Sequence, residues 1–516
     1  MHALYTAGLR RWMTGGDNFP RVVRAVSSTP HAPPYSVKYI TPPRHNANRD
    51  GNRTGHGMDF DGDDSSTQFN SPTPCSPRQN IAVIGSGIAG LSAAWLLARH
   101  HMVTLYEAAP RVGGHSHTVD TPSGQPVDIG FIVYNEQNYP NLTALFRHLG
   151  IATQPSDMSF AVSLDGGRLE YNATDIPGLF AQRRNLVRPR FIRMVRDILR
   201  FYRDAPAHIG ELWRSMEPLG AYLDRHGYSA AFQHDHLLPM AAAIWSTPCA
   251  DMRAYPAAAF LRFCANHGLL QVDDRPAWRT VTGGSREYVT RLAATLAGNI
   301  FQGRPVHRIE RDAAGVTLHD ATGAARRFDQ VVIATHAHEA LSMLAEPSAA
   351  ERALLGAFRP SVNRAVLHRD PTLMPRRRRA WASWNYLGTT RAAADPGLPC
   401  VSYWMNRLQS LPGADLFMTL NPSREPAPGT ILHEASFNHP AFDATALRAQ
   451  HDLWSLQGAR RAWFAGAWFG AGFHEDGLQA GLAVAEAIGG VRRPWSVANE
   501  SARIHLPVLH PAEQAA

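Results

Sequence analysis

The stretch IAVIGSGIAGLSAAW at residues 81–95 constrains the fold more than any other part of the chain. Gly85, Gly87 and Gly90 interrupt an apolar run that is about as long as a short membrane-spanning helix. Each glycine costs a continuous helix about 1 kcal/mol relative to alanine. The pattern therefore predicts a buried strand over 81–84, a tight turn, and a helix over 88–99.

The three glycines have separate tasks in such a strand–turn–helix. Gly85 permits the turn, Gly87 lets a phosphate group approach the backbone, and Gly90 lets the helix pack closely on the strand. We expect a diphosphate at the start of the helix, where N–H groups and the helix dipole favour negative charge. The other predicted contacts of this loop are Ser86, Ile88 and Ala89.

A second strand and an acid follow at the spacing of a dinucleotide-binding fold. The segment MVTLYE over 102–107 ends in Glu107, 22 residues after Gly85. In that fold an acid at this place accepts hydrogen bonds from ribose hydroxyls. Glu107 is therefore a predicted ligand of the nucleotide ribose.

The next residues, EAAPRVGGHSHT over 107–118, contain a second glycine turn. A nicotinamide enzyme has no need of this turn, whereas a second close backbone approach and an arginine can hold a flavin dinucleotide's diphosphate. The segment resembles the double-glycine signature of the flavin adenine dinucleotide (FAD) oxidoreductases of the amine oxidase and phytoene desaturase superfamily. The resemblance implies FAD as cofactor, with contacts from Ala108, Arg111, Gly113, Gly114 and His115.

A C-terminal segment over 463–490 extends this resemblance. We expect Asp476 to cap a helix that begins at Gly477, with Gln479 completing a capping box and Gly489 and Gly490 ending the helix. In the superfamily this helix points its N-terminus at the flavin ring, where its dipole stabilises the reduced form.

The resemblance also implies cofactor contacts from this segment, at Gly466, Asp476, Gly477 and Leu478. One position departs from the family pattern. Members usually have an acid after the glycine of the last strand, and here Ala467 follows Gly466. The usual carboxylate contact is therefore missing or comes from elsewhere.

The middle of the chain resembles the rest of a flavin domain. Residues 281–292 resemble the segment that returns to it, and 305–337 predict three strands with two tight turns. By resemblance, Val306 touches the adenine through its backbone, and 331–335 form a further flavin-domain strand.

Together these segments predict an α/β fold with a doubly wound, Rossmann-type FAD-binding domain that is interrupted by an α+β substrate domain, as in amine oxidases. FAD-binding parts are expected at 80–160, 276–370 and 456–492, and substrate-domain parts at 161–275, mainly helical, and 371–455. Residues 1–79 predict a disordered extension, and 493–516 a C-terminal tail.

A narrower resemblance covers residues 80 to 490. The strings VDIGFIVYNEQNYPNL, AAAIWSTP, NHGLL, WASWNYL, SYWMNRLQ and HPAFD resemble a bacterial branch of NAD/FAD-binding, amine-oxidase-like proteins. Members are often encoded beside cyclopropane fatty-acyl-phospholipid synthases or fused to them. The resemblance implies a lipid acyl substrate and a lipid methyltransferase as functional partner.

Composition narrows the chemistry. Lys38 is the only lysine among 51 basic residues. Amine oxidases of this fold hold a water at the flavin with a lysine, so the usual amine oxidation and Schiff-base chemistry are not expected in the body of the chain. Four cysteines without paired spacing suggest neither disulfides nor a zinc site. No signal peptide is evident, and the expected location is cytoplasmic, with peripheral contact at the inner membrane face.

Two arginine-rich segments leave alternatives open. Over 189–205 arginines recur every three or four residues, which is typical of a surface helix packed on the core or of a basic helix on an anionic membrane. The run PRRRRA at 375–380 predicts a solvated loop or a phospholipid contact. Nucleic acid is not an expected partner, because no aromatic reader motif accompanies the arginines.

Candidate catalytic residues are few, because a flavin dehydrogenation needs little beyond a C–H bond held over the ring in a dry pocket. Tyr134, His474 and Glu475 should approach the ring, with His474 as a general base. Ordinary packing remains open for each. Further aromatic residues, Tyr403, Trp404 and Trp384, could line an apolar channel.

Histidines form three His-x-His pairs, but each lies in a segment that the flavin fold or the family resemblance already accounts for, and no metal is expected. The predicted function is hydride abstraction by FAD from an unsaturated or modified fatty-acyl chain. Three alternatives stay open: an isoprenoid desaturase or isomerase, an amine oxidase, and a non-catalytic flavin-bound partner of a lipid methyltransferase.

Overall fold

The glycine motif folds as a strand, a turn and a helix. The computed structural model describes residues 77–271, 275–390 and 397–507. In it β1 (Asn80–Ile84) leads into α2 (Ile88–Leu97) and then β2 (Met102–Tyr106). The side chains of 81–84 and all of α2 are buried, as expected for a strand and helix at the centre of a doubly wound domain.

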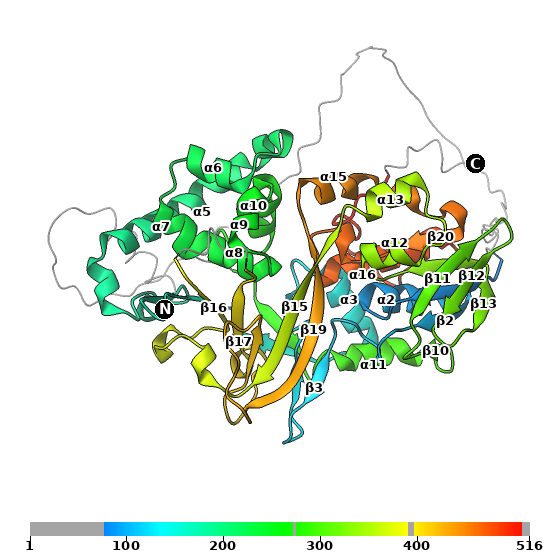
Figure 1. The fold of residues 1–516 in the computed structure, drawn as a ribbon, viewed down its shortest axis with the longest axis horizontal. Coiled ribbons are helices and arrows are strands. Elements are labelled where there is room, and N and C mark those ends of the chain that lie inside the picture. Colours follow the sequence, from blue (N-terminus) through cyan, green and yellow to red (C-terminus); the bar gives the residue numbers. More distant parts are fainter. Residues whose placement is uncertain (1–76, 272–274, 391–396, 508–516) are drawn as a thin grey trace, which may run out of the picture. The chain divides into compact units, whose positions relative to one another are not determined.

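Five parallel strands form the sheet of this domain (Figure 1). Their order is β10 (Ile300–Phe301), β2, β1, β14 (Gln330–Ile333) and β20 (Ala462–Phe464). The strands come from three distant parts of the chain, and the order reverses beside β1, which is where a doubly wound sheet binds its ligand. This confirms the predicted Rossmann-type domain.

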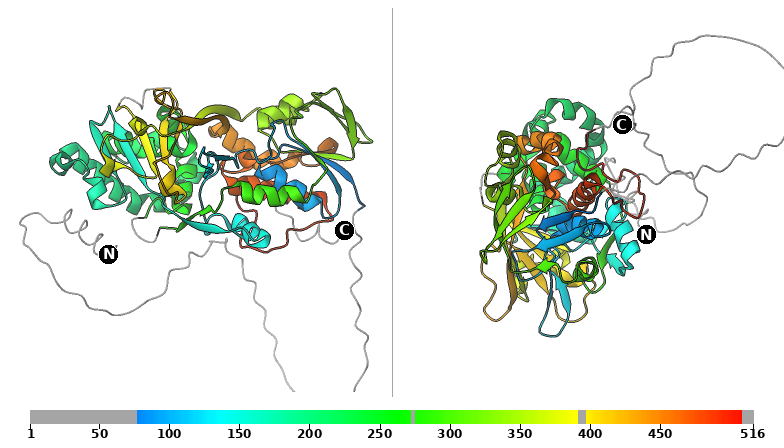
Figure 2. Two further views of the ribbon diagram at one scale, coloured as in Figure 1. Left: turned by 90° about the horizontal axis from the view of Figure 1, so that it is seen from below. Right: turned by 90° about the vertical axis from the view of Figure 1, so that its right-hand side faces the viewer.

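The C-terminal helix α16 (His474–Ile488) packs along α2 (Figures 1 and 2). The two backbones are so close that a Cβ atom at Gly481 would lie 2.1 Å from the carbonyl oxygen of Ala89. The helix ends at Gly489 as predicted, with a φ of 100°.

The predicted start of this helix was wrong. It begins at His474, three residues before Gly477, and Asp476 is the third helical residue rather than the cap. The Asp476 carboxylate accepts a hydrogen bond from the backbone N–H of Phe473 at 2.8 Å. An acid at the third helical position satisfies a free N–H group much as a capping residue does.

A second, seven-stranded mixed sheet forms the core of the substrate domain (Figure 1). Its strand order is β19 (Ile431–Ala441), β15 (Arg359–His368), β18 (Phe417–Leu420), β17 (Cys400–Trp404), β16 (Trp384–Gly388), β7 (Phe160–Leu164) and β8 (Leu169–Asn172). The domain's helices are α4 (Ile176–Leu179), α5 (Pro189–Ser215), α6 (Leu219–Arg225), α7 (Ala230–Phe232), α8 (Leu238–Trp245), α9 (Cys249–Ala254), α10 (Ala257–Asn266) and α14 (Met405–Leu408).

Smaller elements complete the fold. Three antiparallel strands, β11 (Val306–Arg311), β12 (Val316–Asp320) and β13 (Ala325–Phe328), form the predicted double hairpin. The remaining strands are β3 (Thr118–Asp120), β4 (Pro126–Asp128), β5 (Tyr134–Asn135), β6 (Thr153–Ser156) and β9 (Trp278–Val281). The remaining helices are α3 (Pro140–Leu149), α11 (Arg286–Ala294), α12 (Ala337–Met343), α13 (Ala349–Leu355) and α15 (Ala444–Asp452).

The arginine-rich helix α5 is longer than the predicted 189–205 and is amphipathic. Phe191, Met194 and Phe201 are buried, whereas Arg193 and Arg196 are exposed. The apolar side of the helix thus packs on the core. Across the described residues, no helix combines the length and the apolar character needed to cross a bilayer.

Part of the predicted C-terminal tail is packed against the dinucleotide domain. Trp495 stacks on Trp95 with ring centroids 5.9 Å apart, and Arg503 forms an ion pair with Asp476 at 3.2 Å. Lys38 and residues 1–76 of the predicted N-terminal extension lie outside the described residues, which begin at residue 77.

Candidate cofactor site

The turn after β1 leaves one open position. A Cβ atom at Gly85, whose φ is 96°, would lie 2.6 Å from the oxygen of Ala334, and one at Gly90 would lie 1.8 Å from the oxygen of Gly85. At Gly87, by contrast, a Cβ atom would meet nothing within 4 Å. Gly85 and Gly90 are therefore required by packing, and Gly87 borders space that a diphosphate can fill.

Ser86 connects this turn to the acid at the end of β2. The backbone N–H of Ser86 donates to Glu107 Oε2 at 2.9 Å, and its hydroxyl donates to the same oxygen. The N–H of Ala109 donates to Glu107 Oε1 at 2.8 Å. The Glu107 carboxylate is thus fixed beside the turn, where the fold places a ribose.

The second glycine turn packs against the first. A Cβ atom at Gly114 would lie 2.9 Å from the Cα atom of Gly87, and the N–H of Gly113 donates to the Ser86 hydroxyl at 3.0 Å. Both Gly113 and Gly114 have a positive φ, at 115° and 55°. The two sequence motifs therefore form one backbone cradle.

Unpartnered nitrogens converge on this cradle. Arg111 donates through Nη2 to the oxygen of Gly114 at 2.8 Å, but its buried Nη1 has no partner among the described residues. The same holds for His115 Nε2 and His117 Nδ1. Burial lowers the pKa of Arg111, and an unmet buried N–H group is costly. A diphosphate would supply the acceptor that Arg111 lacks, so this residue fits an FAD.

Strand β19 lies against the histidines that follow the glycines. The His115 ring is 5.0 Å from Phe437 and 5.4 Å from His439, between centroids, and the His117 ring is 5.4 Å from His433. Residues 433, 437 and 439 alternate along the strand and share one face of the sheet. We call these five side chains the histidine wall.

A buried amide orients one member of this wall. Asn363 Nδ2 lies 3.2 Å from His439 Nδ1, and Asn363 Oδ1 accepts a hydrogen bond from Asn421 Nδ2 at 2.7 Å. Because an amide nitrogen only donates, His439 Nδ1 accepts and its proton lies on Nε2. Burial, with a smaller effect of His336, lowers the pKa of His439 to about 4. The imidazole is therefore neutral at physiological pH.

The predicted catalytic residue Glu475 serves to join two helices. Its carboxylate accepts hydrogen bonds from Asn141 N at 3.0 Å, Asn141 Nδ2 at 2.9 Å, Leu142 N at 2.9 Å and Gln479 Nε2 at 3.0 Å. Burial raises its pKa, and these donors oppose that shift. These contacts direct Glu475 at the start of α3, and its catalytic role stays a prediction.

The other two catalytic candidates are also enclosed. His474 stacks on Phe131 at 3.9 Å, and its Nε2 lies 2.9 Å from the hydroxyl of Tyr288. Burial lowers the pKa of His474 to about 3. Tyr134 is buried with its ring 5.3 Å from that of Phe146. Neither contact pattern requires catalysis, and both roles stay predictions.

The predicted aromatic channel is only partly assembled. Trp384 and Tyr403 face each other across β16 and β17, with ring centroids 4.9 Å apart, and the indole N–H of Trp384 is buried without a partner among the described residues. Trp404 was assigned to the same wall wrongly. It lies on the opposite face, where its Nε1 donates to Asp415 at 2.9 Å, because neighbouring strand residues point to opposite sides.

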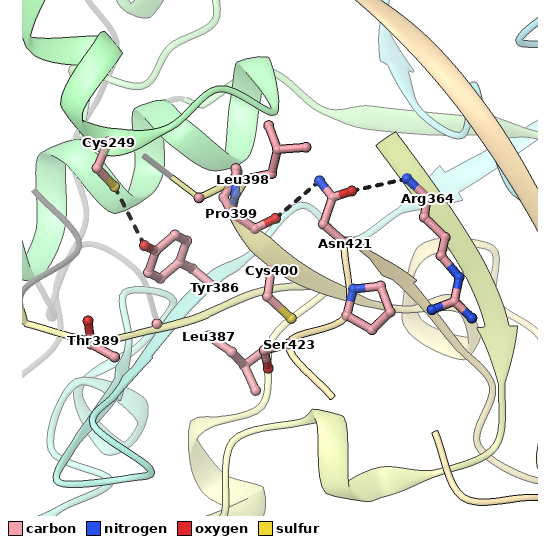
Figure 3. A pocket seen from close by; sticks show the side chains of 13 residues that line it. Cys249, Arg364, Tyr386, Leu387, Thr389, Leu398, Pro399, Cys400, Asn421 and Ser423 are labelled. Carbon is pink, nitrogen blue, oxygen red and sulfur yellow. Dashed lines mark hydrogen bonds between the residues drawn. The ribbon is translucent and has the colours of Figure 1, made fainter. Parts of the chain in front are cut away.

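A separate pocket of about 460 Å³ opens at the ends of β16, β17 and β18 (Figure 3). Tyr386, Leu387, Leu398 and Cys400 supply apolar walls, and Asn421 supplies a polar one. Asn421 also donates to the carbonyl oxygen of Pro399 at 3.5 Å. Because Asn421 holds Asn363, this pocket is linked by hydrogen bonds to the histidine wall.

The remaining predicted cofactor positions lie around the same cradle. Val306 begins β11, and Arg304 N, two residues earlier, donates to the oxygen of Glu107 at 2.9 Å. Gly477 faces the Ile88 side chain, and Leu478 is fully buried. Further positions are Gly466, two residues after the end of β20, Ala89 within α2, and the exposed Ala108 after Glu107. Their contacts to FAD stay predictions.

Across the described part of the chain, no three histidine, cysteine or acidic side chains gather in the way a metal ion requires. The cysteines there, Cys249, Cys264 and Cys400, are buried and form no disulfide with one another.

The sequence profile of the flavin containing amine oxidoreductase family matches residues 88–405, and the chain belongs to that family. Its cofactor is FAD. A relative in Mycobacterium tuberculosis, named "Putative flavin-containing monoamine oxidase AofH", is 29% identical over 273 residues, which is 50% of this chain and 57% of the relative. The L-amino acid dehydrogenase of Synechocystis is 24% identical over 50% of this chain and 57% of its own length. The chain thus spans little more than half of these curated relatives.

Solved structures share the fold. A putrescine oxidase structure aligns with a TM-score of 0.59 at 16% identity, covering 80% of this chain and 98% of its own. The fatty acid isomerase of P. acnes that produces CLA aligns with a TM-score of 0.57 at 16% identity, with the same coverages. At this identity the likeness establishes the fold alone.

Sequence reasoning missed the contribution of β19 and β15 to the site. His433, Phe437 and His439 alternate in the sequence, which is the signal of one strand face, but nothing local indicates that this face meets His115. Asn363 carries no motif at all. Its role is visible only once β15 and β19 are paired, with Asn363 opposite Phe437.

Proposed function

We propose that this protein is an FAD-dependent oxidoreductase that removes hydrogen from an uncharged apolar chain, of which a fatty-acyl chain is the best candidate. One observation carries the proposal. The face of the seven-stranded sheet that meets His115 and His117 presents His433, Phe437 and His439 and no carboxylate on its described strands. A cationic amine would find no counter-charge on this wall, whereas an apolar chain would contact aromatic rings and neutral imidazoles.

The residues of this chain hold the substrate in place, exclude water from it and provide neutral imidazoles that can act as bases. FAD, when bound, supplies the hydride acceptor. Forming a double bond also releases a proton from the neighbouring carbon, and a neutral imidazole can accept it. His115 is the candidate base, because its Nε2 has no partner among the described residues. Burial lowers its pKa, which keeps the imidazole neutral and also weakens it as a base. Trp384 and Tyr403 would exclude water from the chain's path.

Amine oxidation is the second candidate, because the named relatives include amine oxidases. Two features weigh against it. Acids near the N-terminus of α16 are already bound, Glu475 by α3 and Asp476 by Arg503. No described residue is a lysine, since Lys38 lies before residue 77. A protein of Synechococcus elongatus named "Probable zeta-carotene desaturase" is 38% identical over 71 residues, and the CLA-producing fatty acid isomerase shares the fold. Both names point to apolar substrates.

Anaerobic mixing tests the proposal. The purified protein should carry flavin absorbance, and an unsaturated phospholipid or its fatty acid should bleach that absorbance stoichiometrically, with a new double bond detected by mass spectrometry. Putrescine and a carotenoid precursor are the comparison substrates. Bleaching by putrescine alone would replace this proposal with amine oxidation, and bleaching by the carotenoid precursor alone would replace it with isoprenoid desaturation.

The association with a lipid methyltransferase is part of the same proposal. If no lipid bleaches the flavin until a cyclopropane synthase-type methyltransferase is added, the chain is a flavin-bound partner rather than an independent enzyme.

A variant of His115 tests the proposed proton transfer. H115Q should slow bleaching per bound flavin, and its FAD content and folded fraction are measured alongside, so that a loss of cofactor is told apart from the loss of a base.

A further inference from the structure

The most exposed large apolar side chain of the described residues stands among arginines. Val187 is 77% exposed and its neighbour Leu186 is 45% exposed. Both lie on the 3-10 helix η1 (Arg183–Val187), directly before α5. They form a small exposed apolar area whose surroundings are strongly charged.

Six arginines lie on η1 and directly after it, in the turn between β7 and β8, and at 376–377 beside that turn. Hydrogen bonds hold three of them at the turn between β7 and β8. Arg184 Nη2 and Arg188 Nη1 both donate to the carbonyl oxygen of Arg168, the latter at 3.3 Å. Arg377 Nη1 donates to the oxygen of Gly167 in the same turn at 3.2 Å. We call this group the arginine patch; its members are Arg168, Arg183, Arg184, Arg188, Arg376 and Arg377.

The positive charge of the patch is mostly uncompensated. Asp165 pairs with Arg168 at 2.7 Å, and the buried Glu170 pairs with Arg377 at 2.8 Å. Within the described residues, the other four arginines have no carboxylate at ion-pair distance. The third acid of this region is Asp175, the N-cap of α4. Burial, together with the charges of Arg184 and Arg168, lowers the pKa of Arg188, in keeping with the crowding of like charges.

The patch borders the pocket of Figure 3. The N–H of Asp165 donates to the oxygen of Gly388 at 2.9 Å, and the N–H of Thr390 donates to Asp165 Oδ1 at 2.9 Å. Gly388 and Leu398 line the pocket, and Leu398 is itself 39% exposed. The turn that carries Arg168 is thus bonded directly to the strand that forms the pocket wall.

We propose that the arginine patch, with Leu186 and Val187, docks the protein on an anionic phospholipid bilayer. Two apolar side chains can enter the acyl boundary while arginines contact lipid phosphates, which is the combination that surface-bound proteins use. Exposed aliphatic side chains at the centre of the charge fit a bilayer better than a nucleic acid, which offers no apolar layer. Docking would bring the pocket beside the membrane. That consequence rests on the proposed acyl substrate, whereas docking itself does not.

Vesicle flotation of the purified flavoprotein tests the docking. Wild type should bind vesicles that contain phosphatidylglycerol about tenfold or more tightly than pure phosphatidylcholine vesicles, and salt should weaken the binding. R183Q/R184Q/R188Q should lose most of that preference. L186S/V187S should weaken binding with the charge intact. The matched control, R99Q/R352Q/R359Q, removes three exposed arginines elsewhere and should bind as wild type does.

Several results would overturn the inference. These are equal binding to both vesicle types, equal loss in the control triple variant, displacement by soluble glycerol 3-phosphate, or stronger binding to duplex DNA through the same arginines. Failure here is distinguishable from failure of the proposed function. Detergent-solubilised lipid should bleach the flavin of both triple variants as fast as that of wild type, whatever the vesicles show.

Discussion

Arg111 has opposite effects on folding and on cofactor binding. Its buried Nη1 has no partner within the described residues, so the cofactor-free protein bears an unmet donor. We predict that R111M lowers FAD affinity about tenfold to a hundredfold, because a charge-assisted hydrogen bond to phosphate contributes about 1.5–3 kcal/mol. The same change should leave the melting temperature of the FAD-free protein unchanged or higher. FAD titration and thermal melts measure the two effects.

The control for this prediction is R99M, at an exposed arginine beyond α2. It removes the same charge and should change neither quantity. An R111M protein that melts lower without FAD but binds FAD normally would mean that Arg111 supports the fold and not the diphosphate.

Single residues were predictable where their task is local. Gly85, Gly87, Gly90 and Glu107 are tied to one strand–turn–helix, so spacing alone fixes their places. Glu475 was not predictable in this way. Its position in the sequence puts it beside the flavin motif, but a helix turns each successive residue by about 100°, and this turn directs Glu475 to α3.

At the scale of elements, Glu475 should act as a structural joint between α16 and α3. We predict that E475Q lowers stability by about 2–4 kcal/mol, because its amide NH₂ would replace one carboxylate oxygen and face the backbone N–H of either Asn141 or Leu142 in a buried site. Turnover per bound flavin should stay within a few-fold of wild type. Denaturant unfolding and flavin-normalised reduction rates separate the two effects.

The comparison variant is Q479E, which removes the amide of Gln479 that donates a hydrogen bond to Glu475. It should also lower stability, since two buried carboxylates would then face each other. A Glu475 variant with normal stability and reduction slowed by orders of magnitude would restore Glu475 to the catalytic residues.

Elements were predicted best where their ends carry distinct signals. The strand at 81–84 was predictable from its β-branched residues, and the C-terminal end of α16 from the glycine at 489. The start of α16 was displaced by three residues, because an acid stabilises a helix both as its cap and at its third position. Asp476 occupies the third, and the sequence alone does not separate the two.

At the scale of the whole molecule, the site depends on pairings that no local pattern determines. The histidine wall forms only when β19 pairs with β15 and both strands pack against the glycine cradle. His115 and His439, which meet there, are more than 300 residues apart in the sequence. Register and strand order are settled by which faces bury together. That is why the flavin domain could be predicted and its neutral wall could not.

Acid stability is a property of this whole assembly, because many histidines are buried in neutral form. Burial lowers the pKa of His439 to about 4 and of His474 to about 3. In the unfolded chain a histidine takes up a proton near pH 6.5, and the folded protein resists this until far lower pH. The unfolded state therefore binds more protons between those values, and stability must fall as pH falls through that range. The other histidines with lowered pKa values are His115, His117, His226, His234, His236, His267, His336, His368 and His505.

Buried acids oppose this effect but are fewer. Burial raises the pKa of Asp128 to about 6, so the fold holds a proton there that the unfolded chain has lost, and acidification below about pH 6 adds stability. Burial also raises the pKa of Glu475 and Asp476. Eleven histidines against three acids predict a net loss of stability between about pH 7 and about pH 5, with about 2 kcal/mol from a fully buried histidine such as His439 at pH 5.

Denaturant unfolding of the holoprotein across that range measures the loss. H439Q removes one of the titrating groups, so its stability should fall less steeply by about one proton per unfolding event near pH 5. H307Q, at an exposed histidine of β11, should keep the wild-type slope. Stability that rises steadily from pH 7 to pH 5 would show that the buried acids outweigh the histidines, and an unchanged slope in H439Q would show that His439 is already protonated in the fold. In that case the wall beside His115 would be charged, and the preference for an uncharged substrate would lose its physical basis.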